Sequence, residues 1–142
     1  MIEEEQYKRI LGIDYGIKRI GLALSDPLET FAYAFKTIPN DKNLFNDLAS
    51  LLKEKNVKRI ILGIPSEENN RNSDIIKKVQ NFKEQLSKKF SVEIILWDES
   101  YTSAIAKERV IESVTKRSKR RDKRLLDSNS AAIILQEYLE KK

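Results

Sequence analysis

The chain contains neither cysteine nor histidine. Without cysteine it can form no disulfide, no thiolate nucleophile and no cysteine-ligated zinc site. Without histidine it lacks the commonest general base and the commonest metal ligand. An enzyme of this composition must therefore use perturbed carboxylates or lysines, or a hard cation such as Mg²⁺ or Mn²⁺ held by oxygen ligands. These absences favour phosphate chemistry.

Long apolar runs are missing as well. No run approaches the roughly 20 residues needed to cross a bilayer, so we expect no membrane partner. The acidic start, Met1 to Glu5, lacks the basic and apolar parts of a signal peptide, which predicts a cytoplasmic protein. A chain of 142 residues, 40% hydrophobic and 35% charged, has the size and composition of one globular domain. We expect that domain to span residues 1–142.

Positive charge is concentrated in one segment, residues 116–124. The whole chain carries a net charge of +5, and this segment alone accounts for all of it, so the remainder is close to neutral. A run of charge is often only a solvated face. The concentration of the entire excess in one place favours a segment that binds phosphate groups. The cations are Lys116, Arg117, Lys119, Arg120, Arg121, Lys123 and Arg124, accompanied by one acid, Asp122.

Apolar patterning predicts strands and helices along most of the chain. Three strands come first, joined by connections short enough to indicate antiparallel neighbours. Helices and strands then alternate, as in parallel α/β structure, and two helices close the chain. The order βββαβαβαα predicts an α/β fold with a central mixed five-stranded sheet, its first three strands antiparallel, flanked by helices. The predicted strands are residues 7–14, 20–25, 31–35, 59–64 and 92–97, and the predicted helices are residues 44–52, 75–86, 103–112 and 128–139.

Acidic residues stand where predicted elements end or begin. Asp14 closes the first strand, and Asp98 and Glu99 close the last. Asp127 opens the final helix, where a role as N-cap would also explain it. If the first and fifth strands share a sheet, their carboxyl ends converge at the edge where open α/β sheets bind ligands. Clustered carboxylates repel one another and keep their charge mainly when a divalent cation neutralises them.

Four other residues near these acids are candidates for shaping the site or contacting a nucleic acid. Gly16, in the turn after Asp14, is expected to supply a backbone angle that other residues resist or to allow close packing. Lys18 in the same turn and Arg71 in the loop after the fourth strand could contact a nucleic-acid backbone, although exposed loop polarity explains them almost as well. Trp97 could stack on a base, but a strand tryptophan more often belongs to the core.

Four segments resemble the signature segments of the YqgF family, also called RuvX or the Holliday junction resolvase-like proteins. The resemblance covers nearly the whole chain in the family's order, and the four motifs together are far more specific than any one of them. The segments are Asp14-Tyr15-Gly16-Ile17-Lys18-Arg19-Ile20-Gly21, Leu62-Gly63-Ile64-Pro65, Asp98-Glu99-Ser100-Tyr101-Thr102-Ser103 and Asp127-Ser128-Asn129-Ser130-Ala131-Ala132.

The resemblance implies a ribonuclease H-like fold and a metal-dependent nuclease that acts on structured nucleic acid. The role assigned to the family is maturation of the 5′ end of precursor 16S rRNA in ribosome biogenesis. By position, the resemblance assigns catalysis and metal binding to Asp14, Glu99 and Asp127, with Asp98 as a further candidate ligand. A two-metal mechanism with Mg²⁺ or Mn²⁺ needs no histidine. Two positions depart from the pattern: Ser100 replaces a frequent arginine, and Ser130 stands where RuvC-type resolvases carry another acid.

Other functions remain open from the sequence. A resolvase of four-way DNA junctions would use the same active site, and it would need two such sites and hence a homodimer instead of a monomer. A non-catalytic RNA-binding assembly factor would keep the fold and the basic segment. An actin-like ATPase or sugar kinase also opens with an aspartate and glycine hairpin, but it needs two such domains. The candidate partners are precursor rRNA, branched DNA and ribosomal assembly particles.

Overall fold

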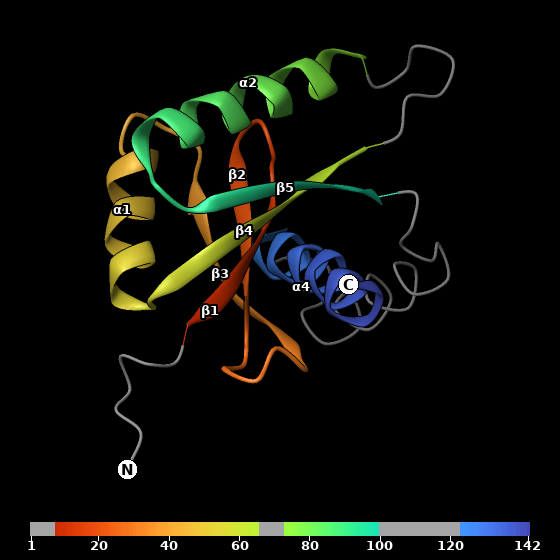
Figure 1. The fold of residues 1–142 in the computed structure, drawn as a ribbon. Coiled ribbons are helices and arrows are strands. Elements are labelled where there is room, and N and C mark those ends of the chain that lie inside the picture. The colour runs from red at the N-terminus through yellow and green to blue at the C-terminus, as the bar shows by residue number, and fades with distance from the viewer. Residues whose placement is uncertain (1–7, 66–72, 100–122) are drawn as a thin grey trace.

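A computed structural model describes residues 8–65, 73–99 and 123–142 of the chain. The predicted helix over residues 103–112, the basic residues from Lys116 to Arg121, and Arg71 lie outside the described residues. Five strands and three helices are described (Figure 1). They are β1 (Arg9–Asp14), β2 (Arg19–Ser25), β3 (Ala32–Pro39), α1 (Leu44–Glu54), β4 (Val57–Ile64), α2 (Ser73–Lys89), β5 (Glu93–Asp98) and α4 (Lys123–Lys141).

The strands form one mixed sheet in the order β3-β2-β1-β4-β5. β2 runs antiparallel to both β1 and β3. β4 runs parallel to both β1 and β5. The predicted five-stranded sheet with three antiparallel strands at its start is therefore confirmed. Because β1, β4 and β5 are parallel neighbours, their carboxyl ends lie at the same edge of the sheet.

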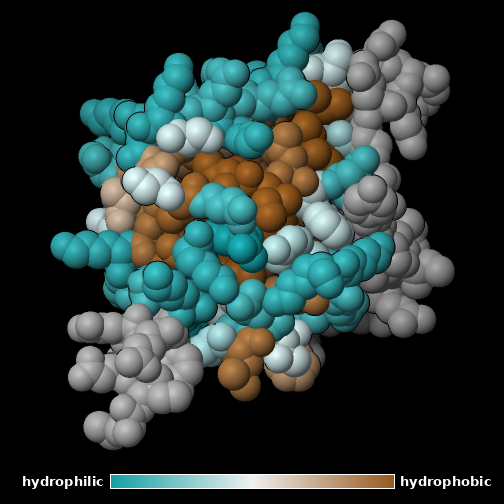
Figure 2. Space-filling view, in the orientation of Figure 1, coloured by the Kyte–Doolittle hydropathy of each residue, from teal (hydrophilic) through white to brown (hydrophobic). Residues whose placement is uncertain are grey.

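Each face of the sheet has its own core. Leu11 and Ile13 of β1 pack with the side chains of α1 and α2, whereas Ile10 packs with those of α4. This alternation follows from the pleat, which sends successive side chains to opposite faces. Between its terminal residues Arg9 and Asp14, β1 is apolar and buried, as is typical of a strand covered on both faces. Figure 2 shows the core that packs against α1 and α2 reaching the surface between these two helices, with hydrophilic residues on the outer sides of both helices.

α1 and α2 bury the apolar faces that the sequence predicted. Leu44, Leu48, Leu51 and Leu52 of α1 are buried at helical spacing. Val79, Phe82 and Leu86 do the same in α2. α1 ends before Asn56, whose φ of 53° lies in the left-handed region that asparagine tolerates better than most residues. None of the described helices combines the length and apolar character needed to cross a membrane.

Two glycines allow α4 to lie close to the sheet. A Cβ on Gly12 would stand 2.8 Å from Leu135 Cβ and 3.0 Å from the carbonyl oxygen of Ala131. A Cβ on Gly63 would stand 2.6 Å from Ile134 Cδ1. Real Cβ atoms do not approach other carbon atoms that closely, so these two positions fix the distance between α4 and strands β1 and β4.

Two boundaries, the end of β3 and the start of α4, differ from the prediction by more than three residues. β3 extends to Pro39, because a bulge opposite Leu22 and Ala23 interrupts the alternation of side chains while the ladder continues beyond it. α4 begins at Lys123, since lysine, arginine and leucine all favour helix and can precede the predicted start. Asp127 therefore lies inside the helix and does not open it, and an N-cap role is wrong. Lys123 and Arg124 belong to the helix as well.

Candidate active site

Asp14 lies on the face of the sheet that α4 covers. In β1, Ile10 packs against α4 and Ile13 against the opposite core. By alternation, Asp14 shares the α4 face with Gly12. Asp14 is the last residue of its strand and pairs with Gly21 of β2. The residue is half-buried.

Glu99 lies on the same face, just after β5, which is separated from β1 by β4. β5 ends at Asp98, and Glu99 Oε1 lies 3.2 Å from the point that a Cβ on Gly63 would occupy. In the parallel ladder Ile13 pairs with Leu62, so Asp14 stands beside Gly63 at the next step. Asp14 and Glu99 therefore flank the same backbone position from the two sides of β4.

Asp98 takes the opposite face. It pairs with Ile64 of β4, and Ile64 packs against the core formed by α1 and α2. Neighbouring strands of a sheet place paired residues on one face. The structure thus brings Asp14 and Glu99 together and does not bring Asp98 to them.

The backbone of α4 carries Asp127 toward these two acids. Ala131 lies over Gly12, and the other end of the helix is held near the start of β4, where Arg59 Nη1 donates to Tyr138 Oη at 3.0 Å. α4 therefore runs in the direction opposite to β1. Residue 127 comes one helical turn before Ala131, and Asp14 comes two residues after Gly12. The turn of α4 that holds Asp127 lies over the end of β1.

These acids suit a hard divalent cation. Carboxylate oxygens are the ligands that Mg²⁺ and Mn²⁺ prefer, and the chain has no histidine or cysteine to attract a softer metal. Within the described side chains no group of three such ligands is complete. The predicted third ligand, Asp127, is described only by its backbone.

The loop after Asp14 is held by two hydrogen bonds from Asn40. The side chain of Asn40 donates from Nδ2 to the carbonyl oxygen of Gly16 at 2.8 Å. The backbone N–H of Asn40 donates to the carbonyl oxygen of Lys18 at 2.9 Å. Tyr15 packs its ring 5.0 Å from that of Phe82 in α2. Sequence reasoning missed Asn40; a polar amide just after a strand could have suggested it.

Of the two roles expected for Gly16, close packing is confirmed and the special backbone angle is not. Its φ is not positive, so the prediction of a special backbone angle is wrong. A Cβ there would stand 2.4 Å from the carbonyl oxygen of Arg19, which makes glycine necessary for close approach. Lys18, beyond this tight point, is exposed.

Trp97 belongs to the core, as expected from its strand. Its ring meets that of Tyr138 edge to face, with centroids 5.6 Å apart and planes at 89°. This packing fixes the last residues of β5 against α4, directly before Glu99.

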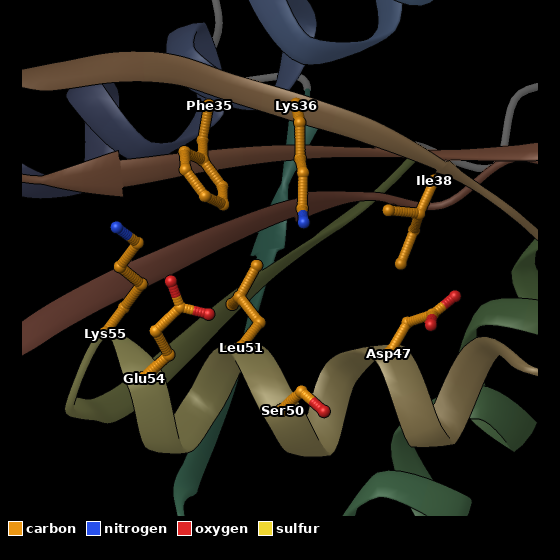
Figure 3. A pocket seen from close by; sticks show the side chains of 8 residues that line it. All are labelled: Phe35, Lys36, Ile38, Asp47, Ser50, Leu51, Glu54 and Lys55. Atoms are coloured by element: carbon orange, nitrogen blue, oxygen red, sulfur yellow. The ribbon is translucent and has the colours of Figure 1, made fainter.

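A groove of about 280 Å³ lies between β3 and α1, on the other face of the sheet (Figure 3). The bulge in β3 lets two successive residues, Phe35 and Lys36, both point toward α1. The groove contains none of the predicted acids, so it is separate from the candidate active site. Its lining consists of Phe35, Lys36, Ile38, Asp47, Ser50, Leu51, Glu54 and Lys55.

Comparisons with known proteins identify the family of the chain. The family model of RuvX, described as Holliday junction resolvase, matches residues 8–141. A protein of Bacteroides thetaiotaomicron named as a pre-16S rRNA nuclease is 39% identical over 135 residues, covering 94% of this chain and 97% of its own. A protein of Porphyromonas gingivalis with the same name is 39% identical over 133 residues, covering 93% and 96%.

Two solved structures share the fold. One is Thermus thermophilus RuvC in complex with a Holliday junction substrate, with a TM-score of 0.59, 14% identity and coverage of 94% of this chain and 95% of that chain. The other is the fowlpox virus resolvase with junction DNA, with a TM-score of 0.54, 18% identity and coverage of 93% and 97%. At such identities the likeness concerns the fold alone, and it confirms the expected ribonuclease H-like fold.

Proposed function

The chain belongs to the RuvX family, and from that premise we propose that it is a divalent-metal nuclease that matures the 5′ end of precursor 16S rRNA. Membership of the family makes it a nuclease, a hydrolase of phosphodiester bonds. The observation that carries the proposed mechanism is the position of Asp14 and Glu99 on either side of Gly63, beneath the turn of α4 that holds Asp127. The names of the relatives support rRNA as the substrate.

In this proposal Asp14, Glu99 and Asp127 hold Mg²⁺ or Mn²⁺ through carboxylate oxygens. When bound, such cations supply the Lewis acidity that activates water and stabilises the leaving oxygen in phosphodiester hydrolysis. Asp98 lies on the opposite face and is a weaker candidate ligand.

Basic residues would hold the substrate beside these acids. Lys18 is exposed and follows Asp14 by four residues. Lys123 and Arg124 belong to the first turn of α4, one turn before Asp127. Together with Arg71 and the basic residues from Lys116 to Arg121, they offer contacts to phosphate groups. Such contacts position a substrate without reading its bases.

A cleavage assay tests this proposal. Wild-type protein, Asp14→Asn and a control, Asp47→Asn, are incubated with a fragment spanning the 5′ end of precursor 16S rRNA in Mg²⁺, Mn²⁺ or excess chelator. Asp47 is exposed on α1, on the other face of the sheet, so its variant should match the wild type. We expect Asp14→Asn to bind the RNA without cutting it. Equal cleavage by Asp14→Asn and wild type, or full activity in chelator, would refute the assigned mechanism.

Resolution of DNA junctions is the second candidate function. The family description and both solved structures refer to Holliday junctions. The same assay therefore includes a four-way DNA junction in competition with the RNA, and sedimentation measures the oligomeric state with each substrate. Preference for the junction together with a dimer would support resolution. Binding to RNA without cleavage under any metal would instead support an assembly factor. For the rRNA nuclease, we propose the cytoplasm and ribosomal assembly particles as its setting.

A further inference from the structure

We propose that Ile17 is a substrate-contacting residue that packs on the last base pair of a duplex where it gives way to a single strand. This inference rests on the proposed function and specifies which part of a structured RNA the enzyme recognises. Ile17 lies three residues after Asp14, so a base pair packed on it would be close to the hydrolysed phosphate.

The exposure of Ile17 is the first observation. The described residues include four exposed large hydrophobic side chains. Three of them, Leu28, Phe31 and Tyr33, belong to the β2–β3 hairpin or the strand that follows it. That hairpin lies at the opposite end of the sheet from the β1–β2 loop (Figure 1). Ile17, with 62% of its surface exposed, is the fourth, and it stands at the end where β1 terminates in Asp14.

The rigidity of the loop is the second observation. Asn40 holds the carbonyl groups on both sides of Ile17, those of Gly16 and Lys18. The tight approach of Gly16 to Arg19 and the packing of Tyr15 on Phe82 fix the base of the same loop. An apolar side chain kept exposed on a rigid loop loses little conformational entropy when it binds. The loop is therefore built to present Ile17.

The chemistry of the neighbours indicates the ligand. Lys18 follows Ile17 and is also exposed, so the loop tip presents one apolar side chain and one cation. A nucleic acid offers an apolar base face and an anionic phosphate at the spacing of one nucleotide. Isoleucine is among the apolar residues that proteins insert against base steps, and such contacts need bases that are not already stacked on both sides. The end of a duplex provides such a base pair.

Matched substrates and variants test the inference. One RNA carries a duplex that ends at the cleavage position, and the second has the same cleaved strand without its complement. Ile17→Ser should raise KM for the first RNA about five- to tenfold, with little change in kcat and no change for the second. Ile17→Leu should restore the wild-type KM. Leu28→Ser removes an aliphatic side chain that is 79% exposed on the β2–β3 hairpin, and it should change KM for neither RNA.

Asn40→Ala tests the role of the loop. Asn40 acts as a positioning residue, so its loss should raise KM for the duplex-ended RNA and leave the single strand unchanged, in the same direction as Ile17→Ser. In the double variant Ile17→Ser/Asn40→Ala, the two effects should not add, because the loop no longer has an apolar side chain to present. Full additivity would contradict this role.

A binding readout separates this inference from the proposed nuclease activity. The fluorescent base 2-aminopurine replaces the adenine of the last base pair, and binding is followed in Ca²⁺ with Asp14→Asn, so that no cleavage occurs. The Asp14→Asn protein with Ile17 in place should change the fluorescence when it binds the RNA. The same protein with Ile17→Ser should bind the RNA through its phosphate contacts without changing the fluorescence. Equal fluorescence changes, or equal KM increases for both RNAs, would overturn the role of Ile17. If the fluorescence changes on binding but the wild-type protein cleaves neither RNA, the proposed nuclease activity is refuted and the contact between Ile17 and the last base pair is supported.

Discussion

Glu99 Oε1 lies 3.2 Å from the point where a Cβ on Gly63 would stand, so the room for this carboxylate depends on a missing side chain in the neighbouring strand. The same glycine admits Ile134 of α4, whose Cδ1 would be only 2.6 Å from that Cβ. One small residue therefore sets the position of a proposed metal ligand and the distance of the helix that carries another.

Gly63→Ala should impair both stability and catalysis, and a second substitution can separate the two effects. The added methyl group overpacks the contact with Ile134, which typically costs about 1–3 kcal/mol of unfolding free energy. Ile134→Val removes Cδ1, the atom that clashes, so the double variant should recover most of that loss in urea unfolding. It should not recover kcat, because the contact of the new methyl group with Glu99 persists. If the double variant recovers both the unfolding free energy and kcat, the position of Glu99 does not depend on the residue at position 63.

Divalent cations should stabilise the folded protein through Asp14. A ligand that binds only the native state adds about 2.7 kcal/mol at 100 times its Kd. Mg²⁺ and Mn²⁺ should therefore raise the melting temperature of the wild type, and this rise should be smaller in Asp14→Asn. Without metal, Asp14→Asn should be at least as stable as the wild type, since it removes a charge from a group of like charges. Ca²⁺ should stabilise and permit substrate binding with poor turnover. An identical metal-induced shift in both proteins would remove Asp14 from the ligand set.

Glu29 should contribute stability that acid abolishes. It accepts hydrogen bonds from Lys58 at 2.8 Å and Lys142 at 2.9 Å, and these bonds, the one from Lys58 foremost, lower the pKa of its carboxyl group below the usual 4.5. A lowered pKa in the folded state means that the contribution is present above the unfolded-state pKa and is lost as the pH falls through the folded-state pKa.

Glu29→Gln tests this pH dependence and keeps the same backbone, with its φ of 58°. At pH 7 the variant should be less stable than the wild type by up to about 1 kcal/mol, since ion pairs near the surface contribute little. Toward pH 3 the difference in unfolding free energy should shrink. A difference that stays constant from pH 7 to pH 3 would assign the effect to packing instead of charge.

The basic segment should dominate the salt dependence of binding. Replacing Lys119, Arg120 and Arg121 with alanine removes three candidate phosphate contacts, and the log–log salt slope for a single-stranded RNA should fall by about 2, at roughly 0.7 per contact. The control variant replaces Lys53, Lys78 and Lys88, three exposed lysines of α1 and α2, and removes the same charge from the other face of the sheet. If both variants lower the slope equally, the effect comes from net charge and not from the segment.

The sequence predicted the architecture because its strands and helices carry local signals. The apolar run of β1, the Leu44 to Leu52 spacing of α1 and the tyrosine and leucines of α4 each identify an element without knowledge of the others. The bulge of β3 was missed, since it depends on pairing with β2. The start of α4 is predicted too late because aspartate commonly caps helices and because Lys123 and Arg124, which also favour helix, belong to the predicted basic segment.

The candidate site was predictable only in part, for a similar reason. That Asp14 and Glu99 share a sheet edge follows from strand order. Their separation from Asp98 follows from the pleat, and needed the register of β5 to be known. Gly63 and Asn40 act through contacts with Glu99 and Gly16 that are distant in sequence, and no periodic pattern records such contacts.

The antiparallel course of α4 over β1 constrains how the sequence can change. Near its carboxyl end, Gln136 accepts a hydrogen bond from the backbone N–H of Ala32 at 2.8 Å and donates one to the carbonyl oxygen of Thr30 at 3.2 Å. Asp127 lies toward the amino end of the same helix. Inserting or deleting one residue between them would rotate one end by about 100° relative to the other. The number of residues from Asp127 to Gln136 is therefore fixed by the contacts at the two ends of α4.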